Sequence, residues 1–160
     1  MRIAVGFDHA GFPLREAVIP ALKRAGHEIV DCGTDSEDSV DYPVHAARAA
    51  KLVSEGDVEL AVLACGSGTG VSIVANKLNG VRAVNARDAG DAEMARRHND
   101  ANVLALAGRK LDDAEAVEIV DAFLEAGFEG GRHQRRVDQI SRIGNGEVPA
   151  APVEATKEAN

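Results

Sequence analysis

An apolar run that ends in a cysteine and a glycine-rich loop constrains the fold of this chain most strongly. Glu59-Leu-Ala-Val-Leu-Ala-Cys65 is almost continuously apolar, as expected for a central strand of a parallel sheet that is buried on both faces. Gly66-Ser-Gly-Thr-Gly70 follows at once, and a helical pattern begins behind it. The segment therefore predicts a strand, a tight loop and a helix, with Cys65 at the carboxyl end of the strand.

Short apolar runs and amphipathic segments alternate along the rest of the chain. They predict further strands over residues 2–7, 27–32, 81–85 and 102–107, and helices over residues 14–25, 42–53, 88–97, 112–126 and 132–143. Pro20 inside the first helix lacks a backbone N–H, which predicts a kink or an early break. Repeated strand–helix units favour an α/β fold of the Rossmann-like type, a three-layer α/β/α sandwich with a five-stranded parallel sheet. Ligands of such sheets bind beyond the carboxyl ends of the strands.

Length and composition describe a single acidic domain. The 160 residues can bury their own core, and we expect one domain over residues 1–143. Residues 144–160 are rich in Gly, Pro, Ala and Glu without a period, which predicts a disordered tail. A net charge of −8 and an aromatic content of 3% argue against a nucleic-acid or anionic-membrane partner. Because no apolar run could span a bilayer and no signal-peptide pattern precedes the first strand, we expect a cytoplasmic protein.

The two cysteines differ in their surroundings. Cys32 ends a strand without a comparable loop, and the chain has no secreted disulfide framework, so we interpret it as a small core residue. Cys65 could also be a core residue, but a thiol that faces backbone N–H groups at a helix start can act as a base or nucleophile. The loop behind it lacks the G-x-G-x-x-G fingerprint, because Val71 stands at the third glycine position, and it lacks a P-loop ending. We interpret the loop as an anion or oxyanion hole.

Three further groups of polar residues could bind a ligand. Asp8-His9 follows the first strand, where either a helix cap or a ligand site would explain the pair. His98-Asn99 ends a helix, and capping accounts for both residue types. Arg132 and Arg136 stand one helical turn apart, and like charges at this spacing destabilise a helix unless an anion lies between them. In an acidic chain this pair favours a phosphate site.

Together these groups indicate a phosphorylated substrate, an anion-stabilising loop and a thiolate base. Abstraction of a proton next to a carbonyl suits them, because it generates an enediolate that needs N–H donors. No His, Cys, Asp or Glu cluster has the spacing of a metal site, so we expect neither a metal nor a cofactor. Acyl transfer with Cys65 as nucleophile is the chemical rival. A protein that binds a sugar phosphate as a sensor, without catalysis, is the alternative from another functional class.

Five separated motifs run through nearly the whole chain except its tail. They are Gly6-Phe-Asp-His-Ala-Gly11, Val40-Asp-Tyr-Pro43, Cys65-Gly-Ser-Gly-Thr-Gly-Val-Ser-Ile-Val-Ala-Asn-Lys77, Arg97-His-Asn-Asp-Ala-Asn102 and Gly130-Gly-Arg-His-Gln-Arg-Arg136. In this order they resemble the type B ribose-5-phosphate isomerase family, which includes allose 6-phosphate and galactose 6-phosphate isomerases. The resemblance implies a cofactor-free aldose–ketose isomerase that converts ribose 5-phosphate to ribulose 5-phosphate in the pentose phosphate pathway. Because isomerases of tetrose, allose and galactose phosphates are similar to this family or belong to it, these sugars are the alternative substrates. Asn85-Ala-Arg-Asp88 departs from the family pattern and could reshape the sugar pocket.

The resemblance also implies roles for individual residues. Cys65 would shuttle a proton between C2 and C1, with Ser67 beside the reacting oxygens. His98, assisted by Asp8, would open the furanose ring. The substrate-binding residues would be Asp8, His9, Gly66, Ser67, Gly68, Thr69, Gly70, Asn99, Arg109, Arg132 and Arg136, with His9 and the three arginines on the phosphate. Family members are homodimers or pairs of dimers with shared active sites, so His98 and Asn99 would act in the site of the partner subunit.

Overall fold

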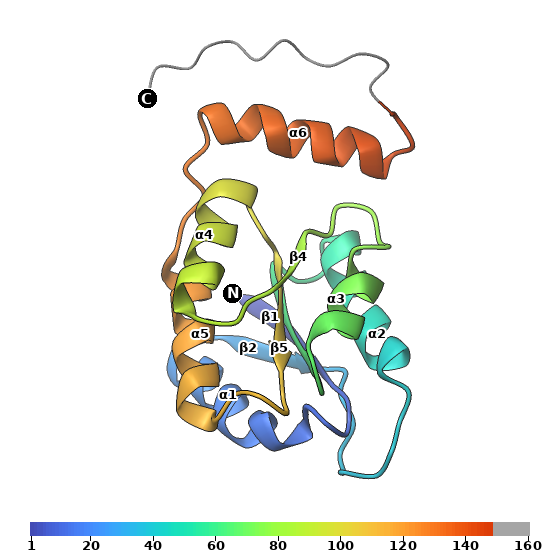
Figure 1. Ribbon diagram of the computed structural model, residues 1–160, viewed down its shortest axis with the longest axis vertical. Coiled ribbons are helices and arrows are strands. Elements are labelled where there is room, and N and C mark those ends of the chain that lie inside the picture. The colour runs from blue at the N-terminus through green and yellow to red at the C-terminus, as the bar shows by residue number, and fades with distance from the viewer. Residues whose placement is uncertain (149–160) are drawn as a thin grey trace.

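The computed structural model describes residues 1–148 and contains a five-stranded parallel sheet between layers of helices (Figure 1). The strands are β1 (Arg2–Phe7), β2 (Glu28–Asp31), β3 (Leu60–Cys65), β4 (Ala83–Asn85) and β5 (Val103–Ala107), in the spatial order β2-β1-β3-β5-β4. Every neighbouring pair in this sheet is parallel. The predicted strands are confirmed, although some of them begin or end one or two residues away from the predicted bounds.

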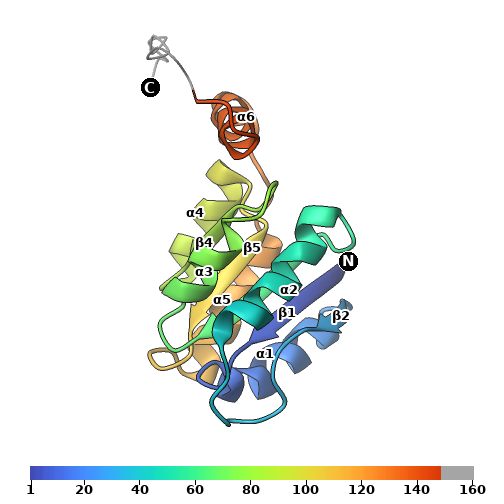
Figure 2. The ribbon, with the colours of Figure 1, turned by 90° about the vertical axis from the view of Figure 1, so that its right-hand side faces the viewer.

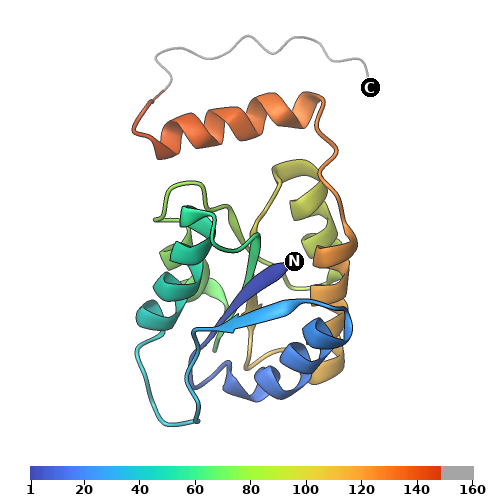
Figure 3. The same ribbon diagram turned by 180° about the vertical axis from the view of Figure 1, so that it is seen from behind.

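The helices are α1 (Phe12–Arg24), α2 (Tyr42–Glu55), α3 (Thr69–Ala75), α4 (Ala89–Asn99), α5 (Asp113–Glu125) and α6 (Arg132–Gly144). α1, α4 and α5 pack on one face of the sheet, and α2 and α3 pack on the other (Figure 2). This arrangement confirms the three-layer sandwich. Seen from behind, β2 forms the outer edge of the sheet beside α1 (Figure 3). α6 lies outside the layers, beyond the end of α4 (Figures 1 and 2).

The apolar side chains explain why the sheet is covered twice. All residues of β3 are buried, as its continuous apolar run predicts. Large side chains such as Phe7 and Phe123 fill the face under α1, α4 and α5. Small residues of α2, including Ala46 and Ala49, let that helix approach the other face closely. The sheet is therefore a rigid platform for the loops at its edges.

One local prediction is wrong. α1 continues through Pro20 to Arg24, so the early break does not occur. Pro20 is exposed and costs the helix one backbone hydrogen bond, while Leu14, Val18 and Leu22 anchor the same helix in the core. Burial of this apolar stripe outweighs the missing bond.

The C-terminal part of the chain is described as far as residue 148. The last helix ends at Gly144, one residue beyond its predicted end. Residues 149–160 of the predicted tail lie outside the described residues. Over residues 1–148 no helix has the length and apolar character that crossing a membrane requires.

The order of the strands defines where a ligand site is expected. From β1 the chain moves outward to β2 on one side, and it then returns through α2 to β3 on the other side of β1. The sheet therefore has its topological switch point between β1 and β3. In sheets of this kind the crevice beyond the carboxyl ends of the two strands holds the ligand.

Candidate active site

A pocket of about 630 Å³ opens at this switch point. It is lined by residues of the loops that follow β1, β3 and β5 and by the start of α2: Asp8, His9, Ala10, Tyr42, Cys65, Gly66, Ser67, Gly70, Arg109 and Lys110. A larger hollow of about 790 Å³ lies on the face formed by α1 and α5 and is lined by alanines, carboxylates and other side chains without a thiol or an imidazole. The pocket at the switch point is therefore the candidate active site.

Cys65 forms part of the pocket wall. It is the last residue of β3, and although it is only 5% exposed, it borders the pocket. Cys32 is a free thiol as well, and burial raises its pKa above the usual range, with Arg48 opposing this effect. A thiol that resists ionisation fits the interpretation of Cys32 as a core residue. Cys65 is therefore the thiol with access to a substrate.

The glycine loop is shaped by a contact with Asn85. Gly68 has a φ of 72°, and a Cβ at this position would lie 2.3 Å from Asn85 Oδ1, so only glycine fits. The Asn85 side-chain amide donates hydrogen bonds to the Ser67 carbonyl at 3.1 Å and to the Thr69 hydroxyl at 3.4 Å. Gly66, Ser67 and Gly70 line the pocket, whereas Gly68 and Thr69 face Asn85. Asn85 thus supports the loop from the side away from the pocket.

Asp8 and His9 are fixed by the backbone around them. Asp8 is 3% exposed, and its Oδ1 accepts hydrogen bonds from the N–H groups of Ala10 and Gly11, both at 2.8 Å. His9 Nδ1 accepts the N–H of Val40 at 3.2 Å. A neutral imidazole with Nδ1 as acceptor carries its proton on Nε2. His9 can therefore donate Nε2–H to an anion in the pocket that it lines.

Arg109 reaches the pocket because the loops after β1 and β5 touch. A Cβ on Gly108 would lie 2.3 Å from the carbonyl oxygen of Ala10, so a side chain there would push the loops apart. The guanidinium side chain of Arg109 lies over Gly66, since a Cβ on Gly66 would be 3.3 Å from Arg109 Cδ. The pocket thus brings a cation, a carboxylate and a thiol to one place.

Four predicted site residues lie away from the pocket, beyond the amino ends of the strands: His98, Asn99, Arg132 and Arg136. Asn99 ends α4 just before β5 begins, whereas Arg109 follows the end of β5. The five residues of β5 separate its two ends by roughly 15 Å. The structure therefore divides the predicted site residues of one chain into two groups, one at each end of β5.

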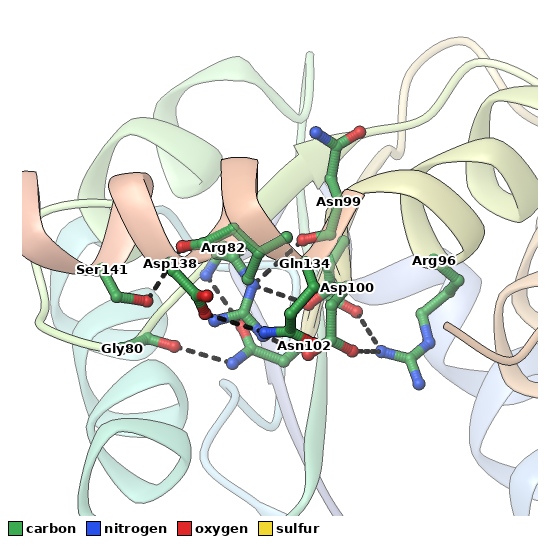
Figure 4. Close-up of polar contacts among 11 residues, drawn as sticks. Gly80, Arg82, Arg96, Asn99, Asp100, Asn102, Gln134, Asp138 and Ser141 are labelled. Carbon is green, nitrogen blue, oxygen red and sulfur yellow. Dashed lines mark hydrogen bonds and ion pairs between the residues drawn. The ribbon is translucent and has the colours of Figure 1, made fainter. Parts of the chain in front are cut away.

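An ionic network fixes the turn that follows His98 and Asn99 (Figure 4). Asp100 adopts a left-handed conformation with a φ of 46°. Its carboxylate pairs with Arg82 Nη2 at 2.7 Å and with Arg96 Nη1 at 3.1 Å. Arg82 Nε also donates to the carbonyl oxygens of Asn99 and Asp100, at 3.0 and 2.8 Å. Figure 4 shows the Asn99 side chain pointing away from this network, so it is available to another molecule.

Replacement of Asp100 by Ala is expected to lower the free energy of unfolding by about 2–4 kcal/mol, the sum of a lost charged hydrogen bond and left-handed strain on alanine. The change leaves Arg82 and Arg96, each with a side chain only 17% exposed, without their shared carboxylate. Urea unfolding would measure this loss in the free energy of unfolding. Asp100→Asn is the matched control and should lose less, because Asn tolerates the left-handed conformation. A loss below 1 kcal/mol for Asp100→Ala would contradict this account of the network.

The predicted site residues omit three residues that line the pocket, which are Ala10, Tyr42 and Lys110. Tyr42 belongs to the motif Val40–Pro43, but the sequence predicts only that it begins a helix. Its ring packs against Gly70, where a Cβ would come within 2.7 Å of it. Lys110 stands beside Arg109 and adds a second cation. The position of Asp8 after β1 predicts its place at the pocket, but nothing local in the sequence indicates the contacts of Tyr42 or Lys110.

Comparison with known proteins gives one family. The family model described as Ribose/Galactose Isomerase matches residues 3–140. Ribose-5-phosphate isomerase B of Escherichia coli (strain K12) is 45% identical over 142 residues, which cover 89% of this chain and 95% of that protein. The solved structure of Clostridium thermocellum ribose-5-phosphate isomerase B is similar with a TM-score of 0.89 at 42% identity, covering 91% of this chain and 99% of that one.

A further structure was solved with a ligand. Ribose-5-phosphate isomerase B of Mycoplasma genitalium with bound ribulose-5-phosphate has a TM-score of 0.86 and 41% identity, over 90% of this chain and 96% of that one. These matches extend over the loops that form the pocket as well as over the sheet. The chain therefore belongs to the ribose/galactose isomerase family and is a sugar-phosphate isomerase.

Proposed function

We propose that the enzyme interconverts ribose 5-phosphate and ribulose 5-phosphate, and that the Cys65 thiolate moves the proton. The position of Cys65 carries this proposal, because the sulfur borders the pocket at the switch point together with Asp8 and the glycine loop. Several relatives are named for the same substrate, and one was solved with ribulose-5-phosphate. Sugar phosphates are charged and stay in the compartment where they are made, so we place the reaction, a step of the pentose phosphate pathway, in the cytoplasm.

The proposed reaction is a proton transfer through an enediolate. The thiolate takes the proton from C2 of the open-chain aldose, and the electron pair of the C–H bond moves to the C1 carbonyl oxygen. Backbone N–H groups of residues 66–70, with the Ser67 hydroxyl, stabilise the negative oxygens. The thiol, whose proton exchanges with solvent, then gives a proton to C1, while the proton of the O2 hydroxyl passes to O1, and the ketose results. The protons and electrons of this isomerisation balance without a redox cofactor or a metal.

The second group of residues fits this reaction only in a dimer. His98 and Asn99 lie about one strand length from Cys65, so we propose that they act in the pocket of the partner subunit. There, His98 with Asp8 opens the furanose ring, and Asn99 binds the sugar. The active sites are then shared between the subunits of a homodimer or of a pair of dimers.

We place the phosphate between the two subunits. His9 and Arg109 of one subunit, together with Arg132 and Arg136 of the partner subunit, would surround it. Guanidinium groups match phosphate oxygens in charge and geometry. The first two turns of α6 supply both of the partner's arginines.

Replacement of Arg136 by Ala is expected to weaken the binding of ribose 5-phosphate by about 1.5–3 kcal/mol, the scale of a hydrogen bond to a charged group. The KM for ribose 5-phosphate and the inhibition constant of ribose measure the effect with and without the phosphate. Arg135→Ala, on another face of the same helix, is the matched control. An equal loss of affinity for ribose would show that Arg136 does not bind the phosphate.

A coupled isomerase assay with four-, five- and six-carbon aldose phosphates tests the proposed substrate. We expect the highest kcat/KM with ribose 5-phosphate. A higher value with a tetrose or hexose phosphate would assign another substrate to the same chemistry. The absence of conversion of any of them, with binding retained, would indicate a sensor and contradict the proposed function.

A further inference from the structure

A second cluster of ionisable side chains lies beyond the amino ends of the strands, where the last turn of α4 meets the first turn of α6 (Figure 1). The imidazole rings of His98 and His133 stack there, with centroids 4.2 Å apart and planes inclined by 5°. Glu129, in the connection between α5 and α6, brings its Oε2 within 3.6 Å of His98 Nε2 and 3.8 Å of His133 Nε2. None of the roles assigned above uses Glu129 or His133.

Arg97 holds the Glu129 carboxylate in this position. Its Nε and Nη2 contact Glu129 Oε1 at 2.6 and 2.5 Å, and the Glu129 N–H donates to the Arg97 carbonyl at 3.0 Å. These ion pairs lower the pKa of Glu129, so the carboxylate is charged at neutral pH. With Oε1 bound to Arg97, Oε2 is the oxygen that faces the imidazoles. The carboxylate cannot turn away without breaking both of its contacts with the Arg97 guanidinium.

The two imidazoles differ in their surroundings. His133 is 7% exposed, and its burial, followed by the charges of His98 and Arg132, lowers its pKa. Arg132 Nε also donates to His133 Nε2 at 3.4 Å, which requires a free lone pair on that nitrogen. The lowered pKa and this acceptor role both favour the neutral form of His133. His98 is the more exposed of the two rings.

The charged groups around His98 come from three segments. Arg97 belongs to its own helix, Glu129 to the connection, and Arg132, His133 and Arg136 to α6. Among them, Glu129 is the anion that faces the ring directly. Its negative charge opposes the positive charges of the arginines around the ring.

The same three residues do not form a good metal site. One nitrogen of each imidazole and one Glu129 oxygen lie within 4.8 Å of one another. However, an imidazole binds a metal in the plane of its ring, and two parallel stacked planes have no point in common. A single ion could bind both nitrogens only after one ring had rotated out of the stack.

We propose that Glu129 and His133 are positioning residues that hold the His98 ring in place as the acid for opening of the furanose ring. In this step the C1–O4 bond breaks and its electron pair goes to O4, which receives the proton of the His98 imidazolium. The C1 hydroxyl gives its proton to the Asp8 carboxylate and becomes the aldehyde. The inference rests on the proposed function, because it concerns the ring-opening step of that reaction.

The test separates ring opening from enediolate formation. Ribulose 5-phosphate is an open chain, because its O5 carries the phosphate and cannot close a furanose ring. Exchange of its C1 hydrogen with D₂O, followed by NMR, requires the Cys65 proton transfer but no ring opening. Turnover of ribose 5-phosphate requires both steps. The two rates are measured on the same preparation of the full-length protein.

Glu129→Gln is expected to lower the turnover of ribose 5-phosphate about 10- to 100-fold, the scale of a misplaced catalytic group, while C1 exchange stays within about 2-fold of the wild type. Glu129→Asp, which withdraws the carboxylate from the rings, should also lower turnover of ribose 5-phosphate and leave the rate of C1 exchange nearly unchanged. Glu93→Gln is the matched control, because Glu93 also pairs with Arg97, at 2.8 Å. It should leave both rates unchanged.

An equal loss of both rates in the two Glu129 variants would show a general structural role, and two unchanged rates would show no role, so either result overturns the inference. Failure of the proposed function is distinguishable, because the wild-type enzyme would then catalyse neither C1 exchange nor turnover of ribose 5-phosphate.

Discussion

Replacement of Cys65 by Ala is expected to lower kcat for ribose 5-phosphate by about 10³-fold, within the range that a positioned base contributes. The thiol is the group on the pocket wall that would carry the proton between C2 and C1. Removal of the sulfur leaves Asp8, His9 and Arg109 in place, so the KM should change little. Steady-state kinetics in both directions would measure the effect.

Cys32→Ala is the matched control for this variant. Cys32 is equally buried but lies outside the residues that line the pocket. Its replacement should leave kcat near the wild-type value and affect only stability. A Cys65→Ala enzyme with a kcat close to that of the wild type would show that another group is the base.

A mixture of two inactive variants is expected to regain about one quarter of the wild-type activity, because random pairing makes half of all dimers mixed and each mixed dimer contains one intact site. The variants are Cys65→Ala and His98→Asn. In a mixed dimer one pocket lacks both groups, whereas the other combines Cys65 of one subunit with His98 of its partner. The effect is large because each variant alone should be almost inactive.

The experiment requires dissociation and reassociation of the subunits, which is followed by labelling each variant with a different tag. The separately treated variants are the controls. The roughly 15 Å between the ends of β5 underlies this expectation, since it keeps His98 away from Cys65 of its own chain. Mixed dimers that remain inactive would show that the sites are not shared.

Much of the fold could be predicted from local patterns. The buried strand that ends at Cys65 follows from one continuous apolar run. The capping box at Asp112 also depends on residues close in the chain, because the Asp112 side chain accepts the N–H of Glu115 and the Glu115 side chain accepts the N–H of Asp112. Pro20 was misjudged because its effect depends on tertiary packing. The core contacts of α1 compensate for a missing hydrogen bond, and the local sequence does not contain that information.

The candidate site was predictable only in part. The rule that ligands bind beyond the carboxyl ends of strands placed Asp8, His9 and Cys65 together, and the structure brings them to one pocket. The support of the glycine loop by Asn85 and the stacking of His98 on His133 join segments that are 18 and 35 positions apart in the chain. Such contacts follow from the way the elements pack, which no periodicity of the sequence encodes.

Deuterium incorporation shows whether the transferred hydrogen passes through a group that exchanges with solvent. Ribulose 5-phosphate is converted in D₂O, and the ribose 5-phosphate formed is examined by NMR for deuterium at C2. Proton transfer by a thiol that exchanges with solvent predicts deuterium at C2 with the wild-type enzyme. Product whose C2 hydrogen comes entirely from C1 would contradict proton transfer by a thiol that exchanges with solvent.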